Sequence, residues 1–76
     1  MKTHHSTQSL YEASYLLATG FKLVASDPGG QKTTLLFADT PELRQAILDF
    51  YNGEGMVRAK PFVENYRTLK DMVFQR

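Results

Sequence analysis

Cysteine is absent from the 76-residue chain, and so is tryptophan. A chain without cysteine cannot form disulfide bridges or thiolate metal sites, and it is compatible with a reducing compartment. The sequence also lacks any apolar run that approaches the roughly 20 residues of a membrane-spanning helix. Its polar N-terminus has no apolar segment of the kind found in signal peptides. We therefore expect a cytoplasmic protein that does not contact a membrane.

Histidine is confined to His4 and His5, and no catalytic motif accompanies them. Adjacent side chains cannot both face one metal ion from a regular element, and two ligands are too few for a stable site. A nucleophilic serine needs a histidine base held by a third group, which the rest of the chain cannot supply. Asp39 and Glu42 are explained by their place at the start of a helix. We expect no enzyme, catalytic residue, metal, cofactor or small-molecule substrate.

Charge is nearly balanced, with nine basic and eight acidic residues and a net charge of +1. Such a balance favours no particular partner, but its distribution along the chain is uneven. Residues 39–55 hold four acidic side chains and one basic one, whereas residues 56–76 hold five basic and two acidic ones. The C-terminal third is therefore the basic end. A chain of this length buries only about 60% of its unfolded surface, which indicates one small domain.

Capping signals and apolar spacing predict the elements in the first two thirds of the chain. Residues 1–8 have no periodic apolar pattern and predict a flexible tail, so that residues 9–76 form the domain. Ser9 and Glu12 fit a capping box, in which each side chain satisfies the other's backbone N–H, at the start of a helix over residues 10–19. Residues 21–26 and 32–38 have the composition of hairpin strands around a turn at residues 27–31.

A second helix should begin after Thr40, with Pro41 in its first position, and end at Asn52-Gly53. Residues 56–58 predict one short strand, and Pro61 marks the first turn of a last helix. We expect an α+β fold with the order helix, strand, strand, helix, short strand, helix. In this fold the helices pack on a small antiparallel sheet.

These capping and core positions resemble those of a known family. The matching residues are Tyr15-Leu16-Leu17 with Gly20-Phe21, Phe37 before Thr40-Pro41-Glu42-Leu43, Tyr51-Asn52-Gly53, and Phe62 with Leu69-Lys70. The pattern is similar to that of a family of small bacterial and phage domains of unknown function, of about this length. The resemblance covers roughly residues 10–75. It implies a fold, and it implies no catalytic residue, ligand or partner.

A row of basic residues on the last helix is the leading candidate for a functional site. By their spacing these cations share one helical flank, where they could contact phosphates, and nearby aromatic rings such as Tyr66 could face an unstacked base. The alternative is a solvated flank, in which Arg67 pairs with Glu64 or Asp71 and the basic stems cover the edge of the core. The candidate nucleic-acid-binding residues are Lys60, Arg67, Lys70, Tyr51 and Phe74.

Apolar side chains beyond the core stripes favour a different class of function. Tyr15 and Leu16 point well away from the inward stripe of the first helix, and an exposed patch of this kind marks an association surface. The alternative is a wider core in which the first helix is sandwiched. The candidate interface residues are Tyr11, Tyr15, Leu16 and Leu48. We therefore expect a non-catalytic binding module for nucleic acid, with protein interaction or homodimerisation as the alternative.

Overall fold

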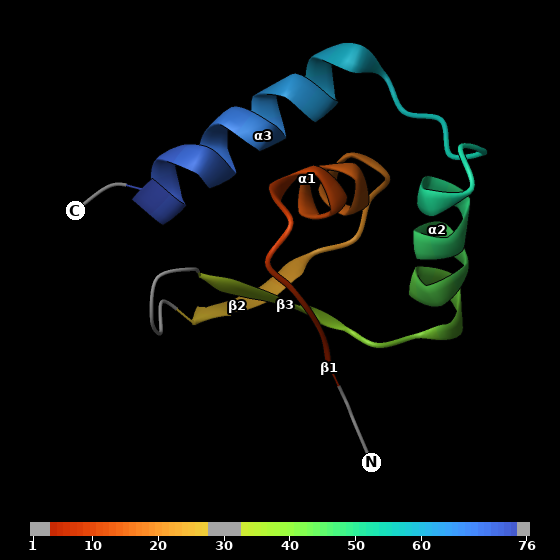
Figure 1. The fold of residues 1–76 in the computed structure, drawn as a ribbon, viewed down its shortest axis with the longest axis horizontal. Coiled ribbons are helices and arrows are strands. Elements are labelled where there is room, and N and C mark those ends of the chain that lie inside the picture. Colours follow the sequence, from red (N-terminus) through yellow and green to blue (C-terminus); the bar gives the residue numbers. More distant parts are fainter. Residues whose placement is uncertain (1–3, 28–32, 75–76) are drawn as a thin grey trace.

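The computed structural model describes residues 4–27 and 33–74. In chain order its elements are β1 His4–Thr7, α1 Leu10–Ala18, β2 Leu23–Asp27, β3 Thr34–Ala38, α2 Pro41–Tyr51 and α3 Ala59–Phe74. β3 is the central strand of an antiparallel sheet with the order β1-β3-β2. Figure 1 shows α1 between the sheet and α3, with α2 beside them. The expected α+β class, with helices packed on a small antiparallel sheet, is confirmed.

The first two helices begin and end where the capping signals predict. Ser9 Oγ accepts a hydrogen bond from the Glu12 N–H, and Thr40 Oγ1 accepts one from the Leu43 N–H, each at 3.1 Å. Beyond the end of α2, Gly53 has a φ of 74°, in the left-handed region that glycine adopts without steric cost. The bounds of both helices thus follow from side chains that satisfy free backbone groups.

The N-terminal residues differ from the expected tail, because His4–Thr7 form the edge strand β1. This strand runs antiparallel to β3 and places Thr7 opposite Leu35. Thr7 is buried, and its hydroxyl accepts a hydrogen bond from the Ser9 N–H at 3.1 Å. Because the inward positions of β1 are polar, no apolar alternation reveals the strand in the sequence. The prediction of a flexible tail over residues 1–8 is therefore wrong for β1.

The short strand expected over residues 56–58 is also wrong, since these residues belong to a connection without regular secondary structure between α2 and α3. β3 already has β1 on one side and β2 on the other, so a further strand could join only the outer edges of the sheet. The connection instead begins by folding back on α2. The N–H groups of Glu54 and Gly55 both donate to the Asp49 carbonyl, at 2.8 and 2.9 Å.

β2 and β3 form the expected hairpin with somewhat shorter strands. Leu23 pairs with Phe37 and Asp27 with Thr34, with an irregularity in β2 directly after Leu23. The turn expected at residues 27–31 falls outside the described residues, except for Asp27. Leu35 and Phe37 are fully buried, so this alternate pair of β3 residues forms the inner face of the sheet.

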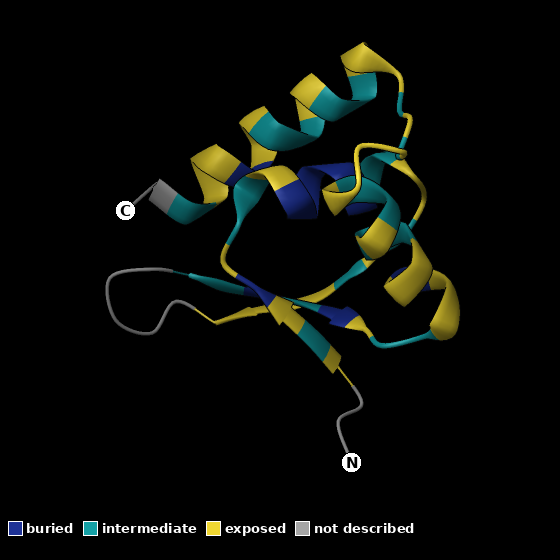
Figure 2. Ribbon diagram, turned by 45° about the vertical axis from the view of Figure 1, so that its right-hand side comes forward, coloured by how far each residue is buried: buried dark blue, intermediate teal, exposed yellow. Residues whose placement is uncertain are grey.

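The core lies between this inner face and α1, and the other helices enlarge it (Figure 2). α1 packs against α3 as well as lying over the sheet, which explains why five consecutive residues of the helix, Glu12 to Leu16, are buried. Tyr15 is 6% exposed and Leu16 is fully buried, so their prediction as interface residues is wrong and the sandwiched helix is the correct alternative. The buried apolar residues are Ala13, Tyr15, Leu16, Leu35, Phe37, Leu43 and Leu69.

Candidate nucleic-acid interface

α3 has one face in the core and one in solvent. Phe62 and Leu69, seven residues apart, pack against the core, and Leu69 is only 2% exposed. Lys60 and Arg67 have the same spacing on the solvent side, and Lys70 follows Arg67 by about one turn. All three basic side chains are exposed. We call Lys60, Arg67 and Lys70 the basic row.

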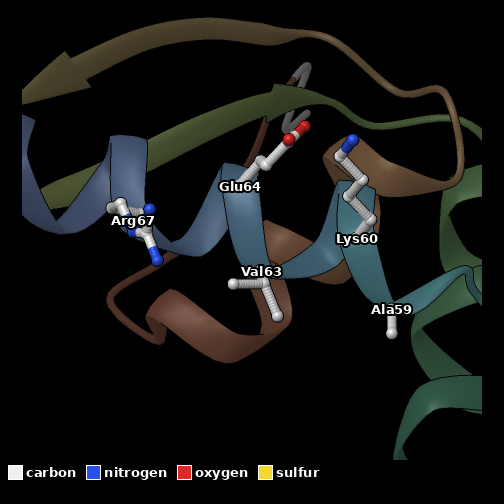
Figure 3. Close-up of a pocket in the computed structure, with 5 residues that line it drawn as sticks. All are labelled: Ala59, Lys60, Val63, Glu64 and Arg67. Carbon is white, nitrogen blue, oxygen red and sulfur yellow. The ribbon is translucent and has the colours of Figure 1, made fainter.

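No ion pair neutralises the basic row within the part of the chain that the structure describes. Glu64 and Asp71 are at helical spacing from Arg67, but neither is paired with it. Figure 3 shows the side chains of Glu64 and Arg67 pointing in different directions. The ion pairs expected in the alternative of a solvated flank are therefore not formed among the described residues, whereas the exposure of the basic side chains agrees with such a flank.

Arg44 on α2 is, in contrast, a cation that is already paired. Its Nε and Nη2 atoms donate to the two carboxylate oxygens of Asp39 at 2.9 and 3.1 Å. This hydrogen bonding, together with the negative charge of Asp39, raises the pKa of Arg44. The basic row has no comparable contact among the described residues, so its N–H donors face solvent.

A shallow hollow of about 450 Å³ follows the basic row (Figure 3). Its lining residues are Ala59, Lys60, Val63, Glu64 and Arg67. All of them belong to one helix, so the hollow has no opposing wall with which to enclose a small molecule. Val63, at 48% exposure, adds an apolar contact between the charged groups. The hollow is instead open along α3, and its charged lining residues are Lys60, Glu64 and Arg67.

A pair of stacked aromatic rings connects α3 with α1. The ring centroids of Tyr11 and Tyr66 are 5.1 Å apart, the ring planes meet at 15°, and Tyr11 is 59% exposed. Hydrogen bonding with Tyr66, followed by the charge of that group and by burial, raises the pKa of Tyr11, while the Lys70 ammonium acts in the opposite direction. The sequence could not reveal this stack, because the two rings come from helices far apart in the chain.

The other aromatic candidates are placed differently. Tyr51 is 65% exposed, but its hydroxyl donates to Glu12 Oε1 at 2.6 Å. Its ring meets Phe50 edge-on, with centroids 5.0 Å apart. Phe74 is the last residue of α3, and its side chain lies outside the described part of the structure. The structure thus leaves the three residues of the basic row exposed on α3, and the hydroxyl of Tyr51 is bonded to Glu12 of α1.

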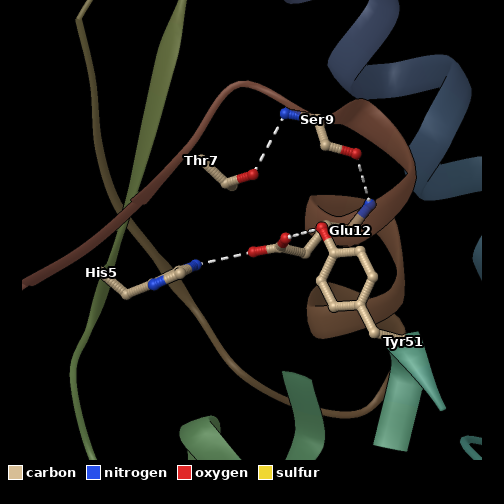
Figure 4. Close-up of polar contacts among 5 residues, drawn as sticks. All are labelled: His5, Thr7, Ser9, Glu12 and Tyr51. Carbon is tan, nitrogen blue, oxygen red and sulfur yellow. Dashed lines mark hydrogen bonds and ion pairs between the residues drawn. The ribbon is translucent and has the colours of Figure 1, made fainter. Parts of the chain in front are cut away.

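A buried carboxylate cluster was missed in the sequence (Figure 4). Glu12, only 4% exposed, accepts hydrogen bonds from His5 Nε2 at 2.7 Å and from the Tyr51 hydroxyl at 2.6 Å. The expected capping box is half correct, because Glu12 does not return a bond to Ser9. The Ser9 N–H donates to Thr7 instead. Glu12 therefore joins β1, α1 and α2.

This cluster can stabilise the fold, but its geometry offers little for chemistry. Both carboxylate oxygens of Glu12 already have donors, and the group lies beneath the surface. The hydrogen bond to Glu12 raises the pKa of Tyr51, with burial and the charge of Glu12 as smaller causes. Among residues 4–27 and 33–73, no three histidine or carboxylate side chains are grouped closely enough to hold a metal ion.

The fold and surface define a small α+β domain with a two-faced C-terminal helix. The chain belongs to the family described as Domain of unknown function (DUF5659), whose model matches residues 2–75. The resemblance to a family of unknown function is thereby confirmed. Comparison with curated proteins and with solved structures gives no significant match. None of the helices in the described ranges has the length and apolar character needed to cross a membrane.

Proposed function

We propose that this protein is a non-catalytic module that binds nucleic acid through the basic row of α3. The observation that carries the proposal is that Lys60, Arg67 and Lys70 are exposed together and unpaired among the described residues. Cations that are already paired gain little from a phosphate, because the existing partner must first be displaced. The unpaired row carries no such cost.

The driving force in this proposal is the release of counterions from the nucleic acid. Each phosphate that a lysine or arginine neutralises frees condensed cations, so affinity falls as salt rises. For a single strand the slope of log K against log salt is about −0.7 per phosphate contact, and three contacts give about −2. The hollow beside Val63 fits an extended strand, because it runs along the helix and has no closing wall.

The test is a titration of a short labelled oligonucleotide, followed by fluorescence anisotropy between about 50 and 200 mM salt. The double variant Arg67→Gln/Lys70→Gln should bind more weakly, with a slope shallower by about 1.4. The matched control Lys22→Gln/Arg44→Gln removes the same charge from elsewhere and should keep the slope of the unaltered protein. Absence of binding at the lowest salt would end the proposal, and binding without salt dependence would discredit the phosphate mechanism.

The proposal includes a cytoplasmic place of action and a bacterial or phage source. Support for the first is the absence of cysteine, which suits a reducing compartment where nucleic acid is abundant. Support for the second is the resemblance of the capping and core pattern to small bacterial and phage domains. Immunolocalisation of the protein in bacterial cells, with and without phage infection, tests both.

The alternative is association with another protein or with a second copy of this chain. It is supported by Tyr11 and Leu48, which are 59% and 56% exposed, although the other two residues of that candidate surface are buried. Light scattering over a range of protein concentrations tests it. A mass that rises with concentration, and that Leu48→Glu returns to the monomer value, would favour homodimerisation. A constant monomer mass would exclude homodimerisation and leave association with another protein as the alternative.

A further inference from the structure

The Tyr11–Tyr66 stack is a surface feature that the phosphate contacts proposed for the basic row do not involve. The rings lie nearly parallel, at 15°, and only one face of each can be covered by the other. Tyr66 is half-buried in α3, whereas Tyr11 stays 59% exposed. A large part of the Tyr11 ring is therefore open to a third flat group.

The stack is close to the basic row. Lys70 follows Tyr66 by one helical turn, and its ammonium is near enough to the Tyr11 hydroxyl to oppose the rise of its pKa. Val63 precedes Tyr66 by one turn and is 48% exposed. Arg67 follows Val63 by one turn in the basic row. Rings, an apolar side chain and cations thus form one continuous strip across α3.

We propose that Tyr11 and Tyr66 form a stacking platform for an unpaired base, so that the ligand of this module is single-stranded nucleic acid. The inference rests on the proposed function, because Lys70 and Arg67 would hold the phosphates beside that base. Every base has a flat π face, and a single strand alternates such faces with negative charge. In a duplex both faces of an internal base are covered by its neighbours, so the Tyr11 ring could not reach them.

Charge complementarity favours this ligand over a basic peptide. Lys70, whose charge acts on Tyr11, and the neighbouring exposed Arg67 repel an arginine or lysine side chain of a peptide that would stack on the rings. They attract a phosphate at each step of a polynucleotide. The strip therefore matches a ligand in which negative charge and aromatic rings recur together.

The test compares two short oligonucleotides with the same number of phosphates, one of thymidine and one of abasic sites. The unaltered protein should bind the thymidine strand between about fivefold and a hundredfold more tightly, because stacking on an aromatic ring has that effect per base. Tyr11→Ala should remove this preference and leave binding of the abasic strand unchanged. Tyr11→Phe, which keeps the ring, should stay within about twofold of the unaltered protein. Met56→Ala, at the 89% exposed Met56, is the control for loss of an exposed apolar side chain.

The outcomes separate this inference from the proposed function. If the unaltered protein binds both strands equally, and Tyr11→Ala does not change this, the stacking platform is overturned. Phosphate binding is then left intact. Failure of both strands to bind at low salt would overturn the proposed function and the platform together. The comparison of the two strands on the unaltered protein decides the matter even where Tyr11→Ala fails to fold. Because the chain has no tryptophan, quenching of tyrosine emission by the thymidine strand alone is a second readout that supports the platform.

Discussion

Glu12 stands three residues after the N-cap of α1, where a glutamate commonly returns a hydrogen bond to the cap. Here its carboxylate turns to His5 and Tyr51, while Thr7 takes over the backbone N–H of Ser9. The exchange is possible because β1 brings polar side chains to the start of α1. One residue thus changes from a local cap to a contact among three elements.

Replacing Glu12 should be costly because the carboxylate is buried. Glu12→Ala leaves the Tyr51 hydroxyl and the His5 ring without their acceptor and opens a small void, at a cost of about 1–3 kcal/mol in the free energy of unfolding. Urea denaturation measures this value. Glu64→Ala is the matched control on an exposed helical site, and it should stay within about 0.5 kcal/mol of the unaltered protein. Equal effects of the two variants would contradict the proposed role of the cluster.

Tyr51 should link stability to alkaline pH. Its pKa is raised in the folded protein above the ordinary value of 10.0, so the folded state binds the phenolic proton more tightly than the unfolded state does. The corresponding stability is fully present below pH 10.0 and is lost as pH rises through the higher folded pKa. Unfolding of the unaltered protein and of Tyr51→Phe, measured on both sides of that value, should show a shallower alkaline decline in the variant. Identical pH profiles would contradict this linkage.

Tyr15 and Leu16 show the limit of a sequence argument about single residues. The spacing of α1 correctly defines one inward stripe, but burial also depends on how many neighbours cover the helix. The sheet covers one side of α1 and α3 the other, so residues off the stripe are buried as well. The number of covered sides is a property of the assembled fold, and no local pattern contains it.

At the scale of elements, the helices could be predicted because their boundaries are set by local chemistry. Thr40 caps α2 through the Leu43 N–H, and the left-handed φ of Gly53 follows its end. β1 could not be predicted, because its stability comes from pairing with β3 and from contacts with α1. The basic row was visible in the spacing of α3. The Tyr11–Tyr66 stack was not, since it depends on how two distant helices pack.

Thr40→Ala tests the local part of this account. It removes the side chain that accepts from the Leu43 N–H and should lower the free energy of unfolding by about 1 kcal/mol. Thr68→Ala, at an exposed position inside α3, is the matched control. Because alanine has the higher helix propensity, this control should be neutral or slightly stabilising. A loss at position 68 equal to that at position 40 would contradict the capping role.

Hydrogen exchange in β1 tests the non-local part of this account, the pairing of β1 with β3. If His4–Thr7 are paired with β3, the strand amides that donate to β3 should exchange slowly with deuterium, at rates comparable with those of β2. The exposed residues Met56 and Arg58, which lie in the connection before α3, are an internal reference for fast exchange. Hydrogen exchange followed by NMR measures all three segments in one experiment. If every β1 amide exchanges as fast as the reference, the strand is contradicted and the flexible tail predicted from the sequence is supported.

At the scale of the whole molecule, α1 and α3 serve both the core and the proposed ligand. α3 packs against α1 on one side and presents the basic row on the other, while the ring of Tyr11 extends from α1 to the edge of α3. The acidic Asp39 is occupied by Arg44 on a different helix. The surface offered to a polyanion is therefore built on two mutually packed helices, which need not reorder on binding.

The most direct test of the central proposal is to observe which backbone amides respond to a ligand. An isotope-labelled sample, titrated with a short thymidine oligonucleotide at low salt, should show shifts concentrated in residues 60–70 of α3 and at Tyr11. Amides of β2 should stay unchanged, and the shifts should fade as salt is added. Shifts centred on the sheet or α2, or no shifts at all, would contradict nucleic-acid binding by the basic row.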